Sequence, residues 1–312
     1  AKIQFSNFDK ELLLVSSECK LHGFSNLIEL KPPVGFSINI KHKKVVSLTN
    51  GIMLSWKPNL LENWNIQCLP KLQYLIDNDW LGIPRSGRVA MVRYADFNCI
   101  ENGKIVRAGF FCDIISVMHQ VGINPLPQAT GHSFIYPGPR THDGIQLDDK
   151  DPVEAEKTMA VLNQMIDDLS QLNQTGNDTY PPEILEKTWA KDMVWYGPAG
   201  IGATYTIPKF QEQHSYPFRQ GLKDKVFNGH ICRYAEGNYA CFFGWPNLSS
   251  TPIGGFLGLP GGDIRADMRV VDVYRREGDK LMENWVLIDI PYWLKQQGLD
   301  ILERSRKINN PS

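Results

Sequence analysis

The chain has 312 residues, 42% of them hydrophobic and 21% charged, which is the composition of a folded globular protein and excludes wholesale disorder. Its 33 basic and 34 acidic side chains leave a formal net charge of -1, so the sequence has no basic footprint for nucleic acid or for an anionic membrane. The length is about twice that of a common domain, so we expect two domains.

The apolar runs and the cysteines exclude two further classes of protein. The longest apolar candidate, Trp285–Leu294, contains Asp289 and Pro291, so it is typical of a strand that runs into a turn and not of a membrane span. The six cysteines form no C-x-x-C pair and show no zinc-ligand spacing. In a chain of this length they indicate buried thiols in a reducing compartment, so we expect a cytoplasmic protein without a metal site.

The first half of the chain contains one clear pattern. Residues 1–78 include apolar segments but no legible helical periodicity, so the sequence predicts no particular structure for them. Two strand-like runs, Val89–Ile100 and Lys104–Asp113, flank a Glu-Asn-Gly turn signal, which predicts a β-hairpin. A short helix, Ile114–Gln120, follows and ends near a glycine. The Pro- and Gly-rich stretch 124–152 then predicts a linker or a wrapping arm.

The second half predicts helices followed by strands, which is the order of an α+β domain with helices on one side of a curved antiparallel sheet. Asp151 and Pro152 are a typical pair of N-cap and first-turn residues, and the apolar residues after them recur at steps of three and four. The predicted helices are Pro152–Leu172, Glu183–Ala190, Pro208–Leu222 and Tyr292–Gln297. The predicted strands are Met193–Tyr196, Asp224–Arg233, Asn238–Trp245, Met268–Arg276 and Lys280–Ile290.

Residues 79–122 and 255–298 are two copies of one sequence pattern. They align without a gap at a constant separation of 176 residues. The matched pairs include Leu81 with Leu257, Arg93 with Arg269, Asp96 with Asp272, Asp113 with Asp289 and Gln120 with Gln296. A shared compositional bias cannot produce matches of so many residue types, so the sequence predicts two copies of one fold.

Three stretches of the second half, Met193–Pro198, Phe256–Pro260 and Glu283–Asp289, carry a resemblance to a known family. They look like a SnoaL-like polyketide-cyclase domain of the nuclear transport factor 2 (NTF2)-like superfamily. The first half is similar to the same domain only from Asp79 to about Pro127. The resemblance is specific for the fold and less specific for the function.

The resemblance implies both a fold class and a domain organisation. The expected fold is α+β, with two tandem NTF2-like cone-shaped barrels, each a curved antiparallel sheet packed with helices. The expected domains are residues 1–127 and 151–312, joined by a Pro- and Gly-rich linker at 128–150. Related domains pair through their sheets, so we expect the two halves to form a pseudo-dimer, and a homodimer of the whole chain is a further expectation.

The resemblance also implies candidate catalytic residues. In the cyclases, an aspartate at the end of the last long strand, just before a terminal helix, acts as acid and base in an intramolecular aldol closure without a cofactor. Asp289 and Asp113 occupy this position. The apolar neighbours Trp285, Leu287 and Ile290 favour this role for Asp289, because desolvation would raise its pKa. Each aspartate equally fits a structural role as a helix cap.

The cyclases place an asparagine and histidines near this aspartate, but the sequence shows no matching asparagine and histidines near Asp289. The candidate ligand-binding residues of the second half are instead aromatic residues and two histidines. They are Trp195, Tyr196, His214, His230, Tyr234, Trp245 and Trp285. Aromatic side chains can wall a pocket for a flat apolar ligand, and a histidine can serve as a second proton carrier. All of them also fit an ordinary role in core packing.

The repeated charges Arg269 and Asp272 predict no shared pocket site. They lie three residues apart on a predicted strand, as Arg93 and Asp96 do in the first copy. Because side chains alternate between the two faces of a strand, the members of each pair point in opposite directions. We expect these residues to form ion pairs that face solvent or the other domain, and the alternative is that they are individual charges of a pocket.

Two functions from different classes fit the sequence. The first is a cofactor-independent enzyme, similar to the polyketide cyclases, in which Asp289 moves a proton to or from carbon in an apolar carbonyl compound. The alternative is a non-catalytic NTF2-like module that binds a hydrophobic small ligand or a protein partner. Both functions predict a mainly apolar pocket, and both predict no cofactor, no nucleic-acid partner and no membrane partner.

Overall fold

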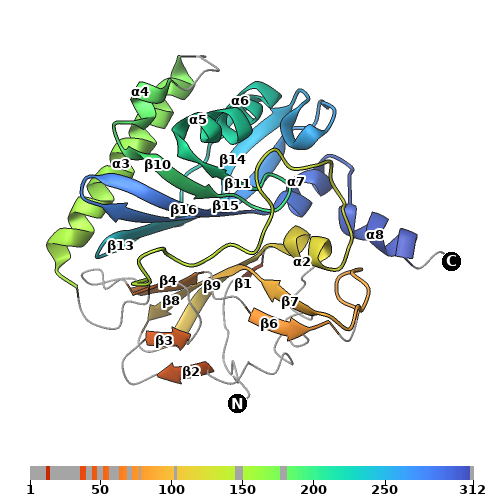
Figure 1. Ribbon diagram of the computed structural model, residues 1–312, viewed down its shortest axis with the longest axis horizontal. Helices are drawn as coiled ribbons and strands as arrows, with labels where there is room; N and C mark the ends of the chain where they lie inside the picture. The colour runs from red at the N-terminus through yellow and green to blue at the C-terminus, as the bar shows by residue number, and fades with distance from the viewer. Residues whose placement is uncertain are drawn as a thin grey trace. The chain divides into compact units, whose positions relative to one another are not determined.

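The computed structural model describes residues 12–14, 36–39, 44–47, 52–55, 63–68, 72–76, 79–101, 104–144, 150–175 and 181–309 (Figure 1). The chain divides into two compact units. Unit 1 comprises the described residues within 1–123, 137–149 and 300–312, and unit 2 comprises those within 124–136 and 150–299. The predicted linker, 128–150, therefore contributes residues to both units. In the described part of the chain, no helix is long and apolar enough to cross a membrane.

Unit 1 is built on a five-stranded sheet that contains the hairpin of the first sequence copy. The order of the sheet is β1 (Leu12–Leu14), β9 (Lys104–Cys112), β8 (Tyr94–Glu101), β5 (Asn63–Cys68) and β4 (Ile52–Ser55). Two short ladders pair β2 (Phe36–Asn39) with β3 (Lys44–Ser47) and β6 (Leu72–Leu75) with β7 (Val89–Val92). The described helices of this unit are α2 (Ile114–Gln120) and α8 (Ile301–Asn309).

Unit 2 is built on a seven-stranded mixed sheet. The order is β11 (Ala203–Tyr205), β10 (Trp189–Tyr196), β16 (Lys280–Ile288), β15 (Ala266–Glu277), β14 (Tyr239–Pro252) and β12 (Leu222–Phe227), and β13 (Cys232–Glu236) also pairs with β14. Strand β10 runs parallel to β16, whereas the other pairs of this sheet are antiparallel. No pairing between the described residues of β11 and β12 closes the sheet. The expected α+β fold class is confirmed, but the sheet of unit 2 is open and mixed where a cone-shaped barrel with an antiparallel sheet was expected.

Helices α3, α5 and α6 cover one side of this sheet (Figure 1). The described helices of unit 2 are α3 (Pro152–Gln174), α4 (Pro182–Leu185), α5 (Thr206–Phe210), α6 (Tyr216–Gly221) and α7 (Ile290–Gln296), with a π-helical turn at Gln211–Ser215 and a 3-10 turn at Phe256–Gly258. The predicted helix Pro208–Leu222 is thus three consecutive pieces, of which the middle one is a π-helix. Local π-helical turns of this kind are common at functional sites.

Two predicted elements have other boundaries in the structure, in both cases because of strand pairing. Strand β10 begins at Trp189, which already pairs with Leu281, so the helix predicted for Glu183–Ala190 is reduced to α4. The strand predicted for Asp224–Arg233 is divided between β12 and β13, and both of these strands pair with β14.

The two sequence copies have the same local structure. Each forms a hairpin, β8–β9 or β15–β16, with a register shift at the matching position, between Cys99 and Ile100 or between Arg275 and Arg276. In each copy, the side-chain amide of a glutamine in the following helix makes hydrogen bonds to the backbone N–H and C=O of one strand residue. Gln120 makes them to Met91, and Gln296 makes them to Asp267. The predicted repeat is therefore visible in the backbone and in its side-chain contacts, within each unit taken by itself.

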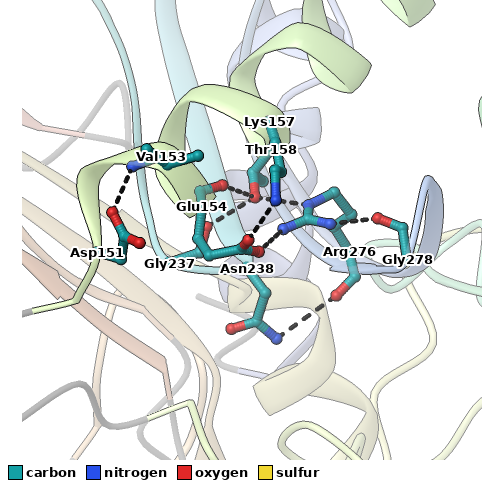
Figure 2. A network of polar contacts seen from close by, with 9 residues as sticks. All are labelled: Asp151, Val153, Glu154, Lys157, Thr158, Gly237, Asn238, Arg276 and Gly278. Atoms are coloured by element: carbon teal, nitrogen blue, oxygen red, sulfur yellow. Dashed lines mark hydrogen bonds and ion pairs between the residues drawn. The ribbon is translucent and has the colours of Figure 1, made fainter.

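The start of α3 is held to the sheet of unit 2 by a polar network (Figure 2). Arg276 of β15 donates to the hydroxyl of Thr158 over 2.8 Å and pairs with the carboxylate of Glu154. Thr158 in turn donates to the carbonyl of Gly237, in the turn between β13 and β14, over 2.7 Å. Asp151 caps the helix by accepting from the amide of Val153, as its position before Pro152 predicts. The network fixes the helix over the side of the sheet that bears the cavity described next.

Candidate active site

A cavity of about 260 Å³ lies inside unit 2, between the sheet and helices α3, α5 and α6. On β15 it is lined by alternate residues, Met268, Val270, Asp272 and Tyr274. On β16 it is lined by Asn284, Val286 and Ile288. Because side chains alternate on a strand, these residues are one face of the β15–β16 hairpin. The lining surface is mainly apolar and includes the acidic side chain of Asp272. The size of the cavity suits a small ligand.

Asp272 is held by two donors on one of its carboxyl oxygens. Its Oδ1 accepts a hydrogen bond from the hydroxyl of Tyr274 at 3.1 Å and one from Nδ2 of Asn284 at 3.2 Å. The residues described in the structure make no hydrogen bond to its Oδ2. The residue is 9% exposed, and burial raises the pKa of its carboxyl from 3.8 to about 7, which the two hydrogen bonds partly offset. At neutral pH the group can therefore both take up and release a proton.

The hairpin register brings these three residues together. Tyr274 is paired directly with Asn284, and Asp272 with Val286, so all of them lie on the cavity face. The register shift between Arg275 and Arg276 gives β16 one extra residue relative to β15. A hairpin with the same turn but without this shift would set Asp272 opposite Trp285, which is on the other face of β16.

His230 contributes a neutral imidazole to the cavity. Its ring stacks on Phe242 with centroids 3.9 Å apart and planes at 17°. Nδ1 lies 3.2 Å from Nε and 3.0 Å from Nη2 of Arg233. Burial, and secondly the charge of Arg233, lower the pKa of His230 to about 4. The ring is therefore uncharged at neutral pH.

His214 is the second neutral imidazole of the lining. The π-helical turn Gln211–Ser215 carries it, and its ring stacks on Trp195 with centroids 3.9 Å apart. Its Nδ1 is buried and has no hydrogen-bond partner among the described residues. Burial lowers the pKa of His214 to about 3. The ring acts as an uncharged part of the wall beside Trp195.

The structure brings three of the seven predicted ligand-binding residues to the cavity: Trp195, His214 and His230. The other four lie elsewhere in unit 2. Tyr196 and Trp285 stack on each other with centroids 5.4 Å apart, and Trp245 lies under the guanidinium of Arg269. Tyr234 is buried, which raises the pKa of its hydroxyl well above the ordinary value. These four residues do not line the cavity described above, so ligand binding by them stays a prediction.

Asp289 and Asp113 cap helices, which is the structural role given above as the alternative to catalysis. Asp289 accepts from the amide of Tyr292 at 3.1 Å and lies 3.4 Å from the guanidinium of Arg269. Asp113 makes the matching cap at the start of α2 and lies 3.5 Å from a nitrogen of Arg93. Burial raises the pKa of Asp289 to about 6, and the charge of Arg269 opposes this effect. Neither aspartate lines the cavity, so proton transfer by them stays a prediction.

The expected role of Asp272 in an ion pair facing solvent or the other domain is wrong. Arg269 and Asp272 do lie on opposite faces of β15, but Asp272 faces the cavity and accepts from neutral donors only. Arg269 pairs with Asp289 instead, and its guanidinium lies 3.5 Å from the ring centre of Tyr292. The ion pair of Arg269 is thus made between β15 and the residue after β16.

Sequence reasoning missed Asp272, Tyr274 and Asn284 as site residues. One signal could have found them: the alternate residues Met268, Val270, Asp272 and Tyr274 are a mainly apolar strand face that contains a single charge. Asn284, His214 and His230 line the same cavity as Asp272, and Asn284 contacts its carboxyl directly.

No protein-family profile and no curated protein sequence matches the chain. Solved structures do match it. A putative SnoaL-like polyketide cyclase from Jannaschia sp. CCS1 is 15% identical, over 46% of this chain and 92% of that chain, with a TM-score of 0.35. An NTF2-like protein from Burkholderia xenovorans LB400 is 10% identical, over 46% and 96%, with a TM-score of 0.34. IdmH, a putative polyketide cyclase from Streptomyces antibioticus, is 18% identical, over 44% and 99%, with a TM-score of 0.33.

The structures similar to this chain thus include SnoaL-like polyketide cyclases and NTF2-like proteins, which are the groups that the sequence resembles. Each of these matches spans somewhat under half of the chain. TM-scores this low carry no conclusion about the site or its chemistry.

Proposed function

We propose that unit 2 is a cofactor-independent enzyme that moves a proton to or from a carbon atom of an apolar carbonyl compound, with Asp272 as the acid and base. One observation carries the proposal: a buried carboxyl with a pKa of about 7 faces a mainly apolar cavity. Two donors occupy its Oδ1 and leave Oδ2 for the ligand. A carboxyl in an apolar site is suited to proton transfer near neutral pH.

The proposed step is the removal of a proton from the carbon next to the carbonyl. The C–H bond breaks, and Oδ2 of Asp272 takes the proton. The electron pair of that bond forms a carbon–carbon double bond while the carbonyl π electrons move to oxygen, which gives an enolate. The enolate carbon then attacks a second carbonyl carbon of the same ligand, as in an aldol closure, and the alkoxide that forms takes the proton from Asp272. In a ligand whose carbon–carbon double bond is conjugated with the enolate, the far carbon takes the proton instead, as in an isomerisation. Either route returns the carboxylate.

A non-catalytic module that binds a hydrophobic ligand is the second candidate. One observation favours it: Tyr274 and Asn284 already satisfy Oδ1 of Asp272, so the carboxyl does not need a ligand in order to be stable in the cavity. In this case Asp272 would orient a ligand that carries a donor group and would exchange no proton with carbon.

Hydrogen exchange at carbon separates the two candidates. The probe is 2-tetralone, an apolar bicyclic ketone, in D2O, and NMR follows the loss of the signals of its protons next to the carbonyl. We expect the wild-type chain to accelerate this loss over buffer and Asp272→Asn to abolish the acceleration. Asp289→Asn is the matched control and keeps it. Acceleration that survives in Asp272→Asn, or that disappears in Asp289→Asn alone, would refute the role of Asp272.

A further inference from the structure

We propose that Arg233 is a positioning residue that fixes the tautomer of His230, so that the cavity offers a neutral Nε2–H donor to an oxygen atom of its ligand. The contact between Arg233 and His230 does not depend on the proposed function. The identity of that oxygen, the carbonyl oxygen that becomes the enolate, rests on the proposed function.

The ring of His230 is held from two sides. It stacks on Phe242 of β14 at 3.9 Å, and the ring of Phe227 of β12 meets it at 76° with centroids 5.0 Å apart. Phe242 is paired directly with Asp272 in the ladder between β14 and β15. His230 therefore stacks on the neighbour of the proposed proton carrier, in the same cavity.

Arg233 determines which ring nitrogen carries the proton. Two of its nitrogen atoms, Nε and Nη2, lie 3.2 and 3.0 Å from Nδ1 of His230. A guanidinium group has five N–H donors and no acceptor, so Nδ1 must be the acceptor in this contact. A neutral imidazole that accepts at one nitrogen carries its proton on the other. The ring is then an Nε2–H donor.

The guanidinium is itself oriented from another element. Its Nη1 donates to Oδ1 of Asn163 on α3 over 2.8 Å. Both contacts of Arg233 thus go to neutral acceptors, and none of the described carboxylates pairs with it. Its charge lies directly behind His230, where it disfavours an imidazolium and favours negative charge on an atom that accepts from Nε2–H.

This arrangement specifies the ligand more closely. The cavity presents a proton acceptor at Asp272 and a neutral donor at His230, inside a mainly apolar wall. The matching ligand is an uncharged ketone or a related carbonyl compound with an acidic C–H bond next to the carbonyl. Its oxygen accepts from His230 while its C–H faces Asp272.

The test is ¹⁵N NMR of the histidine rings in the full-length chain at pH 7. A His230→Gln spectrum identifies the signals of His230 by their loss. We expect wild-type His230 to have an unprotonated Nδ1 and a protonated Nε2, and Arg233→Met to populate both tautomers. A protonated Nδ1 in the wild type overturns the inference, and so does a tautomer that is unchanged in Arg233→Met.

A kinetic readout tests the same inference through turnover. In the 2-tetralone exchange assay, His230→Gln is expected to lower kcat on the order of 10²-fold, as loss of one donor to a developing oxyanion does. Arg233→Met is expected to lower kcat with little change in KM, and Arg233→Lys, which retains a donor, to restore part of it. A change in KM alone would contradict the positioning role. If neither the wild type nor any variant accelerates the exchange of 2-tetralone protons while the NMR result holds, the proposed function is wrong and the assigned tautomer of His230 is still correct.

Discussion

At the scale of residues, the carboxyl of Asp272 within β15 and that of Asp289 just after β16 differ in their partners more than in their burial. Asp272 and Asp289 are both buried, and burial raises the pKa of both. Asp289 has a cationic partner, Arg269, and a helix amide to satisfy it. Asp272 has two neutral donors and an open side toward the cavity. The second environment suits a proton carrier, because neutral donors stabilise the carboxylate of Asp272 but no cation fixes it in the charged form.

Replacing Asp272 by asparagine is predicted to stabilise the protein above neutral pH. The folded-state pKa of about 7 lies above the ordinary 3.8, so the folded state binds this proton more tightly than the unfolded state. The contribution of the group to stability is complete below about pH 4 and is lost as the pH rises through about 7. We expect Asp272→Asn to gain about 4 kcal/mol over wild type at pH 8 and little at pH 4, since each unit of pKa shift corresponds to about 1.4 kcal/mol. Urea unfolding at both pH values measures this, and destabilisation at pH 8 would contradict it.

The pH dependence of proton exchange follows from the same group. If Asp272 acts as the base, kcat/KM rises with pH and levels off above the pKa of its carboxyl, about 7. The pKa values of His214 and His230, about 3 and about 4, lie too low to add a step near neutrality. A rate profile between pH 5 and 9 checks this. A flat profile, or one that falls as the pH rises through 7, would show that the ionised carboxyl is not the base.

At the scale of elements, the sequence predicted the β15–β16 hairpin, helix α7 and the cap at Asp289, because turn residues, alternation and capping are local signals. It did not predict which face borders the cavity, since nearly all residues of β16 are buried and both faces are largely apolar. The register shift after Arg275, which sets Tyr274 opposite Asn284, has no local signature in the sequence.

The network at the start of α3 gives a prediction at this scale. Thr158 is fully buried, and its hydroxyl contacts the carbonyl of Gly237 and the Nε of Arg276. Thr158→Val retains the volume but leaves both partners unsatisfied, so we expect a loss of about 1–3 kcal/mol. Lys157→Ala, one residue earlier on the exposed face of α3, is the matched control and should change stability by less than about 0.5 kcal/mol. Equal effects in thermal unfolding would contradict a specific role of the network.

At the scale of the whole molecule, the duplicated hairpin and helix support two related domains, but the two copies are not equivalent in chemistry. The first copy has Asp96 where the second has Asp272. At the positions of Tyr274 and Asn284 it has Asn98 and Ala108. The first copy thus has an amide where Tyr274 has its hydroxyl, and no polar side chain at the position of Asn284. The tandem NTF2-like arrangement, the pairing of the halves and a homodimer of the chain stay predictions from the repeat and the resemblance.

This difference predicts that the two equivalent aspartates behave differently. Asp96→Asn is expected to leave the exchange of 2-tetralone unchanged, whereas Asp272→Asn abolishes it. The two substitutions are chemically identical and occupy matching positions of the repeat, so each controls for the other. Loss of exchange in Asp96→Asn, with the fold intact by circular dichroism, would show that the first copy takes part in the chemistry.

Native mass spectrometry of the purified chain tests the central claim most directly, because it detects a retained ligand whatever the identity of the substrate. Wild type, Asp272→Asn and Asp289→Asn are purified side by side and compared for retained small molecules. If Asp272 carries the proton, Asp272→Asn stalls turnover and retains a ligand that wild type and Asp289→Asn release. A ligand retained by Asp289→Asn but not by Asp272→Asn, or retained equally by all three forms, would contradict the account.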